Sequence, residues 1–215
     1  HATGVCVFWV RVPTVATASD TVIYLFYTNA SVTTSQENKT GTWNADYLAV
    51  WHLPNGTTLS GTDSTTNGKT LSNSSTSAAA VKFDGGASFA PGNYLYGASN
   101  SDFQFANNAT LSVSFWASEP ALDGAARNIL GNLKTASGYR GWEIQYRAEN
   151  GTSPRIEFLL IDTYPTDALH VYTTPENPYT LTHYTVTYSG SKLPTGVAIY
   201  ISGAPVALTT GANTL

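Results

Sequence analysis

The chain has 215 residues, of which 42% are hydrophobic and 11% are charged, and its formal net charge is −4. This charge argues against a nucleic-acid-binding protein, which would carry a basic patch, and no apolar run approaches the roughly 20 residues that cross a bilayer. Cys6 is the only cysteine, so these residues can form neither an intrachain disulfide nor a cysteine-based zinc site. We therefore expect no nucleic-acid partner and no membrane insertion.

Runs of β-branched and aromatic residues recur along the chain and predict strands. Turn residues separate the runs, and no window has the period of an amphipathic helix. The sequence therefore predicts an all-β fold, an antiparallel β-sandwich of jelly-roll type. The predicted strands before the last hairpin cover residues 5–12, 21–27, 111–117, 142–147, 155–161 and 170–174.

Residues 183–206 predict a β-hairpin with one buried face. Two alternating runs flank a turn that contains glycine and proline, and side chains two residues apart in a strand share a face. Nothing in the segment has the character of a nucleophile, so we interpret it as a wall of the fold. Its apolar face is predicted to comprise Tyr184, Val186, Tyr188, Val197, Ile199 and Ile201.

Residues 54–80 are almost devoid of large apolar side chains and contain two Asn-Gly pairs. Asn-Gly favours tight turns, whereas a polar stretch of this length is also typical of a flexible linker. The composition leaves both interpretations open.

Five segments together resemble the laminin-G-like, concanavalin A-like jelly roll of secreted and phage proteins. They are AVWHL (49–53), VKFDG (81–85), LSVSFWAS (111–118), GWEIQYR (141–147) and the hairpin at 183–206. The resemblance assigns residues 49–215 to this domain. Residues 1–48 resemble the C-terminal part of a β-rich module of unknown function from bacterial, archaeal and phage surface proteins. Both resemblances imply a jelly roll truncated at both ends, from a longer extracellular, cell-surface or virion-surface protein.

Concanavalin A-like folds include glycoside hydrolases, which need two carboxylates across a cleft. Hydrolases on this fold often carry them as Glu-x-Asp-x-x-Glu on one strand, and this sequence has no such run. Glu143 and Glu157 each lie in an alternating strand, where we expect them to face solvent. A Gly-x-Ser-x-Gly nucleophile elbow is also missing from the sequence. We therefore expect no enzymatic activity.

Loop residues predict a binding site. Sugar recognition needs an aromatic platform for the ring and planar polar groups for the hydroxyls. Trp142 begins an alternating strand, so a place in the core is the competing interpretation for that residue. The candidate glycan-binding residues are Asn93, Tyr94, Tyr139, Arg140, Trp142, Tyr164 and His170.

Calcium is the one cofactor that the resemblance suggests. Candidate ligands are Asp84, Asp162 and Asp167, because Ca²⁺ prefers carboxylate and carbonyl oxygens. Family members that bind calcium tend to carry further acids after the Phe-Asp-Gly turn, where this chain has Gly86, Ala87 and Ser88.

The sequence thus favours a non-catalytic recognition or attachment module. Its expected partners are a cell-surface or polymeric glycan and neighbouring subunits or domains of the same longer protein. Two alternatives stay open: a structural spacer or decoration domain that makes subunit contacts, and an accessory domain of a glycoside hydrolase.

Overall fold

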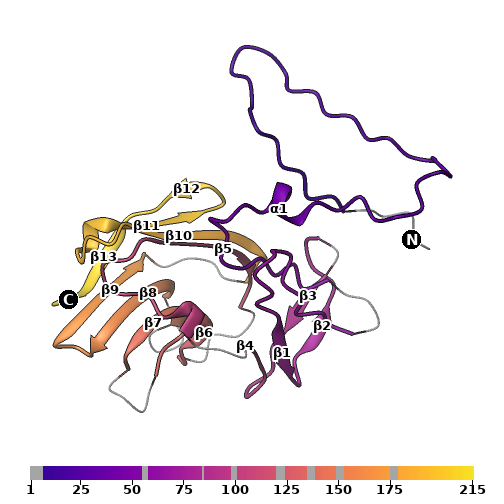
Figure 1. Ribbon diagram of the computed structural model, residues 1–215. Helices are drawn as coiled ribbons and strands as arrows, with labels where there is room; N and C mark the ends of the chain where they lie inside the picture. The colour runs from indigo at the N-terminus through magenta and orange to yellow at the C-terminus, as the bar shows by residue number, and fades with distance from the viewer. Residues whose placement is uncertain are drawn as a thin grey trace. The chain divides into compact units, whose positions relative to one another are not determined.

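The computed structural model describes residues 7–54, 58–83, 85–97, 101–119, 124–134, 139–148, 153–174 and 179–215 (Figure 1). The chain divides into two compact units, residues 1–98 and 99–215. Regular structure is almost entirely antiparallel strand, which confirms the predicted all-β fold. None of the helices in the described ranges has the length and apolar character required to span a bilayer.

The unit of residues 99–215 is a sandwich of two antiparallel sheets. The larger sheet has the order β13-β9-β8-β7-β6, and the smaller has the order β12-β11-β10-β5. The larger comprises β6 (Arg127–Gly131), β7 (Gly141–Ala148), β8 (Pro154–Thr163), β9 (Asp167–Thr173) and β13 (Leu208–Asn213). The smaller comprises β5 (Leu111–Ala117), β10 (Thr182–Tyr188), β11 (Val197–Ile201) and β12 (Ala204–Pro205). Single-turn 3-10 helices occur at η1 (Ser101–Phe103) and η4 (Pro194–Gly196).

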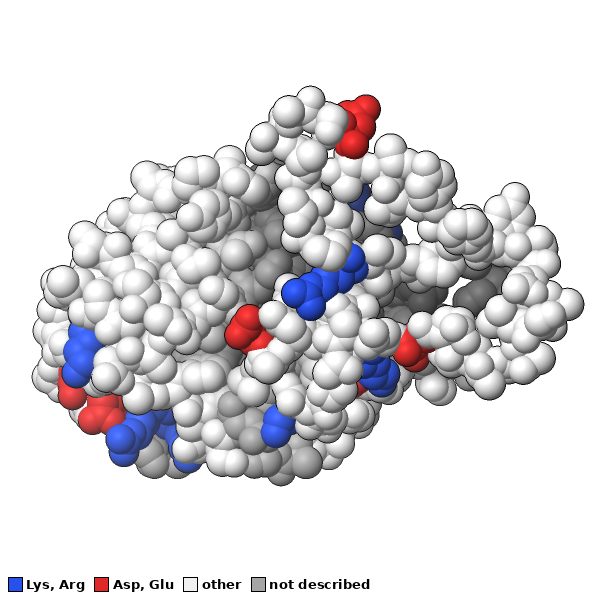
Figure 2. Space-filling model, turned by 45° about the horizontal axis from the view of Figure 1, so that its top comes forward, with Lys and Arg blue, Asp and Glu red and all other residues white. Residues whose placement is uncertain are grey.

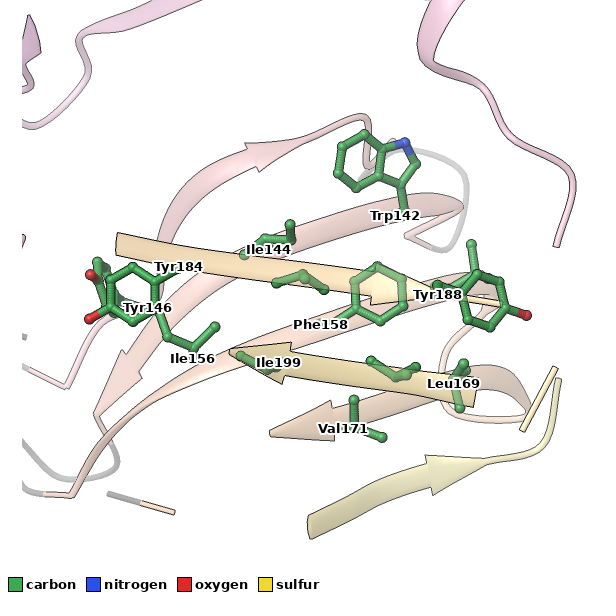
Figure 3. Close-up of a cluster of buried hydrophobic side chains, with 13 residues drawn as sticks. Trp142, Ile144, Tyr146, Ile156, Phe158, Leu169, Val171, Tyr184, Tyr188 and Ile199 are labelled. Carbon is green, nitrogen blue, oxygen red and sulfur yellow. The ribbon is translucent and has the colours of Figure 1, made fainter. Parts of the chain in front are cut away.

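One hydrophobic core fills the space between the two sheets (Figure 3). Alternation along each strand turns one set of side chains inward, and burying such large apolar groups is the main favourable contribution to folding. Ile144 and Phe158 come from the larger sheet, whereas Tyr184 and Ile199 come from the smaller one. These four side chains are fully or almost fully buried.

The predicted hairpin is confirmed, and the residues predicted to share its apolar face lie opposite one another. β10 pairs with β11 so that Val186 lies opposite Ile199 and Tyr188 lies opposite Val197. The hydroxyl of Tyr188 donates to the Asn107 carbonyl oxygen at 2.6 Å, which gives this buried ring a polar partner.

In the described residues of the unit 1–98, regular structure consists of one short helix and two small two-stranded antiparallel sheets. The helix is α1 (Lys39–Thr42), β1 (Leu71–Ser74) pairs with β4 (Tyr94–Gly97), and β2 (Ser77–Ala79) pairs with β3 (Gly86–Ser88).

Buried Asp63 organises the polar stretch whose composition allows either a loop or a linker. Its carboxylate accepts hydrogen bonds from the backbone N–H groups of Val50, Thr65 and Lys69 and from the Thr65 hydroxyl. Burial alone would raise the pKa of Asp63, but these hydrogen bonds hold it below its ordinary value. The described part of residues 54–80, which excludes 55–57, is therefore a folded loop, and β1 and β2 lie within it.

The prediction of strands at 5–12 and 21–27 is wrong for the residues that the structure describes. Residues 7–38 contain no strand; the apolar side chains of 7–10 and 21–27 are exposed, and Val12 is half-buried. A strand needs a partner for its backbone N–H and C=O groups, and the described residues supply none to these two runs. Residues 5 and 6 lie outside the described ranges.

Candidate functional site

One end of the five-stranded sheet gathers four of the predicted site residues: Tyr139, Arg140, Asp162 and Tyr164. We call this set the rim. Antiparallel pairing places Gly141 opposite Ile161, so the residues on either side of that pair meet. Arg140 Nε lies 2.7 Å from Asp162 Oδ1, and both side chains are exposed. An exposed ion pair adds little stability, so these groups are available to a ligand at small cost.

Two exposed tyrosines flank this ion pair in the chain. Tyr139 precedes Arg140 and is 52% exposed, and Tyr164 lies in the turn between β8 and β9 and is 45% exposed. The backbone at Gly141 has a φ of +131°, and a Cβ there would collide with the carbonyl oxygen of Asn132. A glycine is therefore required where the chain enters β7, and it fixes the direction from which Tyr139 and Arg140 approach the sheet.

His170 lies behind the rim and is buried. Its ring meets the ring of Tyr164 edge-on at 6.5 Å, and it packs against the backbone of Gly211 at the irregular position of β13. Neither ring nitrogen makes an aligned hydrogen bond to the described residues. The sequence predicts a direct glycan contact at His170, but its burial leaves it in a supporting position for Tyr164.

A polar cluster continues from His170 across the face of the sheet that points away from the core. At its centre is Glu157, which has no exposed surface. Its carboxylate accepts hydrogen bonds from Gln145 Nε2 and Arg155 Nε, each at 2.6 Å. His170 Nε2 lies 3.4 Å away, which forms an ion pair only when the imidazole is protonated. The guanidinium of Arg155 stacks over Tyr172, 3.9 Å from the ring centre.

The two carboxylates on this face have opposite pKa shifts. Burial raises the pKa of Glu143, the charge of Glu157 adds to that rise, and a hydrogen bond with Asn128 opposes it. Burial would also raise the pKa of Glu157, but the polar groups of His170, Arg155 and Gln145 beside its oxygens outweigh burial and lower the pKa to about 2.

The prediction that Glu143 and Glu157 face solvent is therefore wrong. Alternation does place both residues on the face away from the core, because their neighbours Ile144 and Phe158 are core residues. Side chains from the adjacent strands then pack around Glu157 and remove it from water. Sequence reasoning missed this cluster, although an Arg and a Glu two residues apart in a strand share a face and could have indicated it.

Trp142 is a core residue and is not part of the rim. It is 3% exposed, its Nε1 donates to the Phe103 carbonyl oxygen at 2.7 Å, and its ring contacts Phe105. The ring has no free face on which a sugar could stack, so the prediction of a glycan contact at Trp142 is wrong. Its alternation with Ile144 and Tyr146 favours the core interpretation, which is the correct one.

Asn93 and Tyr94 belong to the other compact unit. Asn93 Nδ2 donates to the Ser75 carbonyl oxygen at 2.8 Å, which holds the turn before β4. Tyr94 is exposed, and its ring lies 5.6 Å from that of Tyr96. These residues form a separate aromatic pair, and a binding role for them stays a prediction.

The described residues do not assemble a calcium cage. Asp162 is engaged by Arg140, and Asp167 pairs across the β8–β9 turn with Thr163. Within the described ranges, no group of three or more His, Cys, Asp or Glu side chains could hold a metal ion. Calcium takes six to eight oxygen ligands, so two carboxylates do not fit it by themselves. Asp84 lies outside the described residues, and its role stays a prediction.

Comparison with known proteins gives one match. A family model described as the concanavalin A-like lectin/glucanases superfamily matches residues 91–215, which include the whole rim and every strand of the sandwich. Searches of curated proteins and of solved structures returned no match. The two-sheet sandwich agrees with this family. The chain belongs to the concanavalin A-like lectin/glucanase superfamily.

Proposed function

We propose that this protein binds glycans without cleaving them and that the rim is its binding site. The observation that supports the proposal is the exposed Arg140–Asp162 pair, flanked in the chain by two exposed tyrosines at one end of the larger sheet. Tyrosine rings stack on the apolar faces of sugars, and planar guanidinium and carboxylate groups hydrogen-bond to pairs of hydroxyls. Membership of a superfamily that includes lectins favours the same ligand class.

A non-catalytic role is supported by the position of the carboxylates. Glycoside hydrolysis needs an acid and a nucleophile or base that both reach the scissile bond. Glu143 and Glu157 are 8% and 0% exposed, and Glu157 is fully engaged by its neighbours. A hydrolase also needs two carboxyl groups with opposite pKa shifts, but here the carboxylate oxygens of both residues are too buried to reach a sugar.

The surface chemistry supports an uncharged polymeric or cell-surface glycan as the partner. Figure 2 shows a face with few charged side chains, in agreement with a chain in which 11% of residues are charged. Cell-surface glycans lie outside the cell, so the proposal includes a location that is extracellular, on a cell surface or on a virion. The net charge of −4 would repel nucleic acid rather than recruit it.

The proposal is tested on a glycan array that carries polymeric and cell-surface glycans. We expect binding by the whole chain and a loss of at least about tenfold in affinity for Tyr164→Ala and for Arg140→Ala. Tyr94→Ala tests the other candidate aromatic pair, and Tyr47→Ala is the matched control, because Tyr47 is 46% exposed, lies in the other unit and is not a candidate binding residue. Loss of binding in Tyr94→Ala with Tyr164→Ala unchanged would move the site away from the rim. A second array, run with a chelator, tests whether glycan binding requires calcium.

A structural role is the second candidate function. It is favoured by the exposed apolar side chains of residues 21–27, which suit subunit contacts better than sugars. If the chain bound no glycan on the array while circular dichroism showed that it was folded, this role would be favoured over glycan binding.

A further inference from the structure

His170 is a buried side chain with unused hydrogen-bonding groups, and it lies directly behind the rim. It is 5% exposed, and neither Nδ1 nor Nε2 makes an aligned hydrogen bond to the described residues. Buried polar side chains are nearly always hydrogen-bonded, because leaving one without a partner costs stability. A change in the protonation state of this imidazole can therefore bring a new hydrogen bond into use.

The imidazole ring of His170 touches the rim through packing. The ring lies against the backbone of Gly211, where an added Cβ would collide with it. Its centre is 5.5 Å from that of the Tyr172 ring and 6.5 Å from that of the Tyr164 ring, which it meets edge-on. A shift of the imidazole therefore changes its contact with Tyr164, an exposed tyrosine of the rim.

The carboxylate of Glu157 faces the ring of His170. Glu157 Oε2 lies 3.4 Å from His170 Nε2. Burial alone would raise the pKa of Glu157, but hydrogen bonds from His170, Arg155 and Gln145 lower it to about 2. The carboxylate is thus charged throughout the range, about pH 5 to 8, in which imidazoles gain and lose their proton. A protonated His170 would form a charge-assisted hydrogen bond with it, which is shorter and stronger than a neutral one.

The other charged groups of this face act on the same proton from further strands. Arg155 is positive and opposes protonation of His170, but it pairs with the other oxygen of the Glu157 carboxylate, at 2.6 Å, and its guanidinium lies over Tyr172. Glu143, on β7, is a second carboxyl group on this face, and its own pKa is raised by burial. Strand β13, on the other side of His170, has no charged residue. A proton on His170 is therefore answered by the carboxylate that its ring already faces.

We propose that His170 is a positioning residue for Tyr164 and that its protonation, through pairing with Glu157, tightens glycan binding at the rim. Pairing draws Nε2 from 3.4 Å toward the ~2.8 Å of a charge-assisted hydrogen bond and fixes the ring. A fixed ring holds Tyr164 in one position, and a contact residue that is ordered before binding lowers the cost of binding. Affinity should therefore be about two- to tenfold higher at about pH 5.5 than at about pH 8. This inference rests on the proposed function, because it needs the rim to be the binding site.

The first test follows the Tyr164 ring by NMR in the whole chain, with labelled tyrosine and histidine and without any glycan. We expect its signals to shift together with those of His170 between about pH 5 and 8. His170→Phe keeps an aromatic ring beside Tyr164 but cannot take up a proton, so the shift should disappear. His183→Gln is the matched control, because His183 lies on β10 of the other sheet and pairs with Ser114. The Tyr164 shift should persist in this variant.

Glu157→Gln provides a second variant that keeps the imidazole and removes the charge it faces. An amide cannot form an ion pair with a protonated His170, so most of the Tyr164 shift should be lost. This variant decides the question if His170→Phe does not fold. A Tyr164 shift of full size in either variant overturns the proposal, as does a natural chain in which Tyr164 does not respond to pH.

The second test repeats the array of polymeric and cell-surface glycans at about pH 5.5 and about pH 8. The natural chain should bind about two- to tenfold more tightly at the lower pH, and His170→Phe should bind equally at both. Glycan binding that is equal at both pH values in the natural chain overturns this proposal and leaves the proposed function standing. An array without any binding overturns the proposed function, and the NMR test still decides whether His170 controls Tyr164.

Discussion

Strand β8 and residues 21–27 are similar in sequence but opposite in structure. Both are runs of branched and aromatic side chains, and the pattern predicts a strand for each. β8 has a partner on each edge and buries Ile156 and Phe158 completely, whereas residues 21–27 have no partner among the described residues and leave Phe26 91% exposed. Local pattern therefore specifies the tendency to form a strand, and the neighbours available for pairing decide whether that strand forms.

The difference in packing between β8 and residues 21–27 is tested most directly by removing one phenylalanine from each region. Phe158→Ala should lower the free energy of unfolding by about 3 to 5 kcal/mol, because it leaves a cavity between the sheets. Phe26→Ala should change it by less than about 0.5 kcal/mol, because its ring is in water. Urea denaturation of both variants at a low protein concentration measures the difference. Equal effects would mean that residues 21–27 are packed against the fold in solution.

The sandwich is the most predictable part of the molecule, for a physical reason. In β10 and β11, side chains alternate between core and surface, so the alternation alone places Val186 and Ile199 on one buried face, where both are found. Periodicity reports burial on one side of a strand. It does not report whether the strand has neighbours, and so it fails for residues 21–27.

The sequence predicts which residues belong to the rim, but it does not predict that they lie close together. Arg140 and Asp162 are 22 positions apart, and only the register between β7 and β8 brings them together. The same limitation explains His170 and Glu157. Alternation gives the face that a side chain occupies, but burial on that face depends on long side chains from adjacent strands, which single-strand patterns do not contain.

The face of β8 that points away from the core is also buried, but its stability depends on hydrogen bonds and ion pairs rather than on apolar packing. Glu157→Gln should cost about 2 to 4 kcal/mol of stability at pH 7, since it leaves the Arg155 guanidinium without its carboxylate while both are largely buried. Urea denaturation at neutral pH measures this cost. If Glu157→Gln left the free energy of unfolding unchanged, solvent would have to reach the cluster freely.

The pH dependence of the same variant provides an internal control. The folded pKa of Glu157 is about 2, below its ordinary value near 4.5. Its contribution to stability is therefore present above about pH 4.5 and is lost as the pH falls from there toward 2. The natural chain should lose stability across this window, and Glu157→Gln should lose less. Parallel acid titration curves for the two proteins would contradict the assignment.

Glu143 should show the smallest effect and the opposite sign. Its carboxylate lies on the same face, but its pKa is raised, first by burial and then by the charge of Glu157. A raised pKa means that the ionised form is disfavoured in the fold, so stability falls as the pH rises through the folded pKa. Glu143→Gln removes this charge and keeps a group that can pair with Asn128. We expect a gain of roughly 1 kcal/mol at pH 7 and no gain at pH 3, where the natural side chain is already neutral. Thermal unfolding at the two pH values measures both. A loss of stability at pH 7 would show that Glu143, like Glu157, is held by a partner that favours its charge.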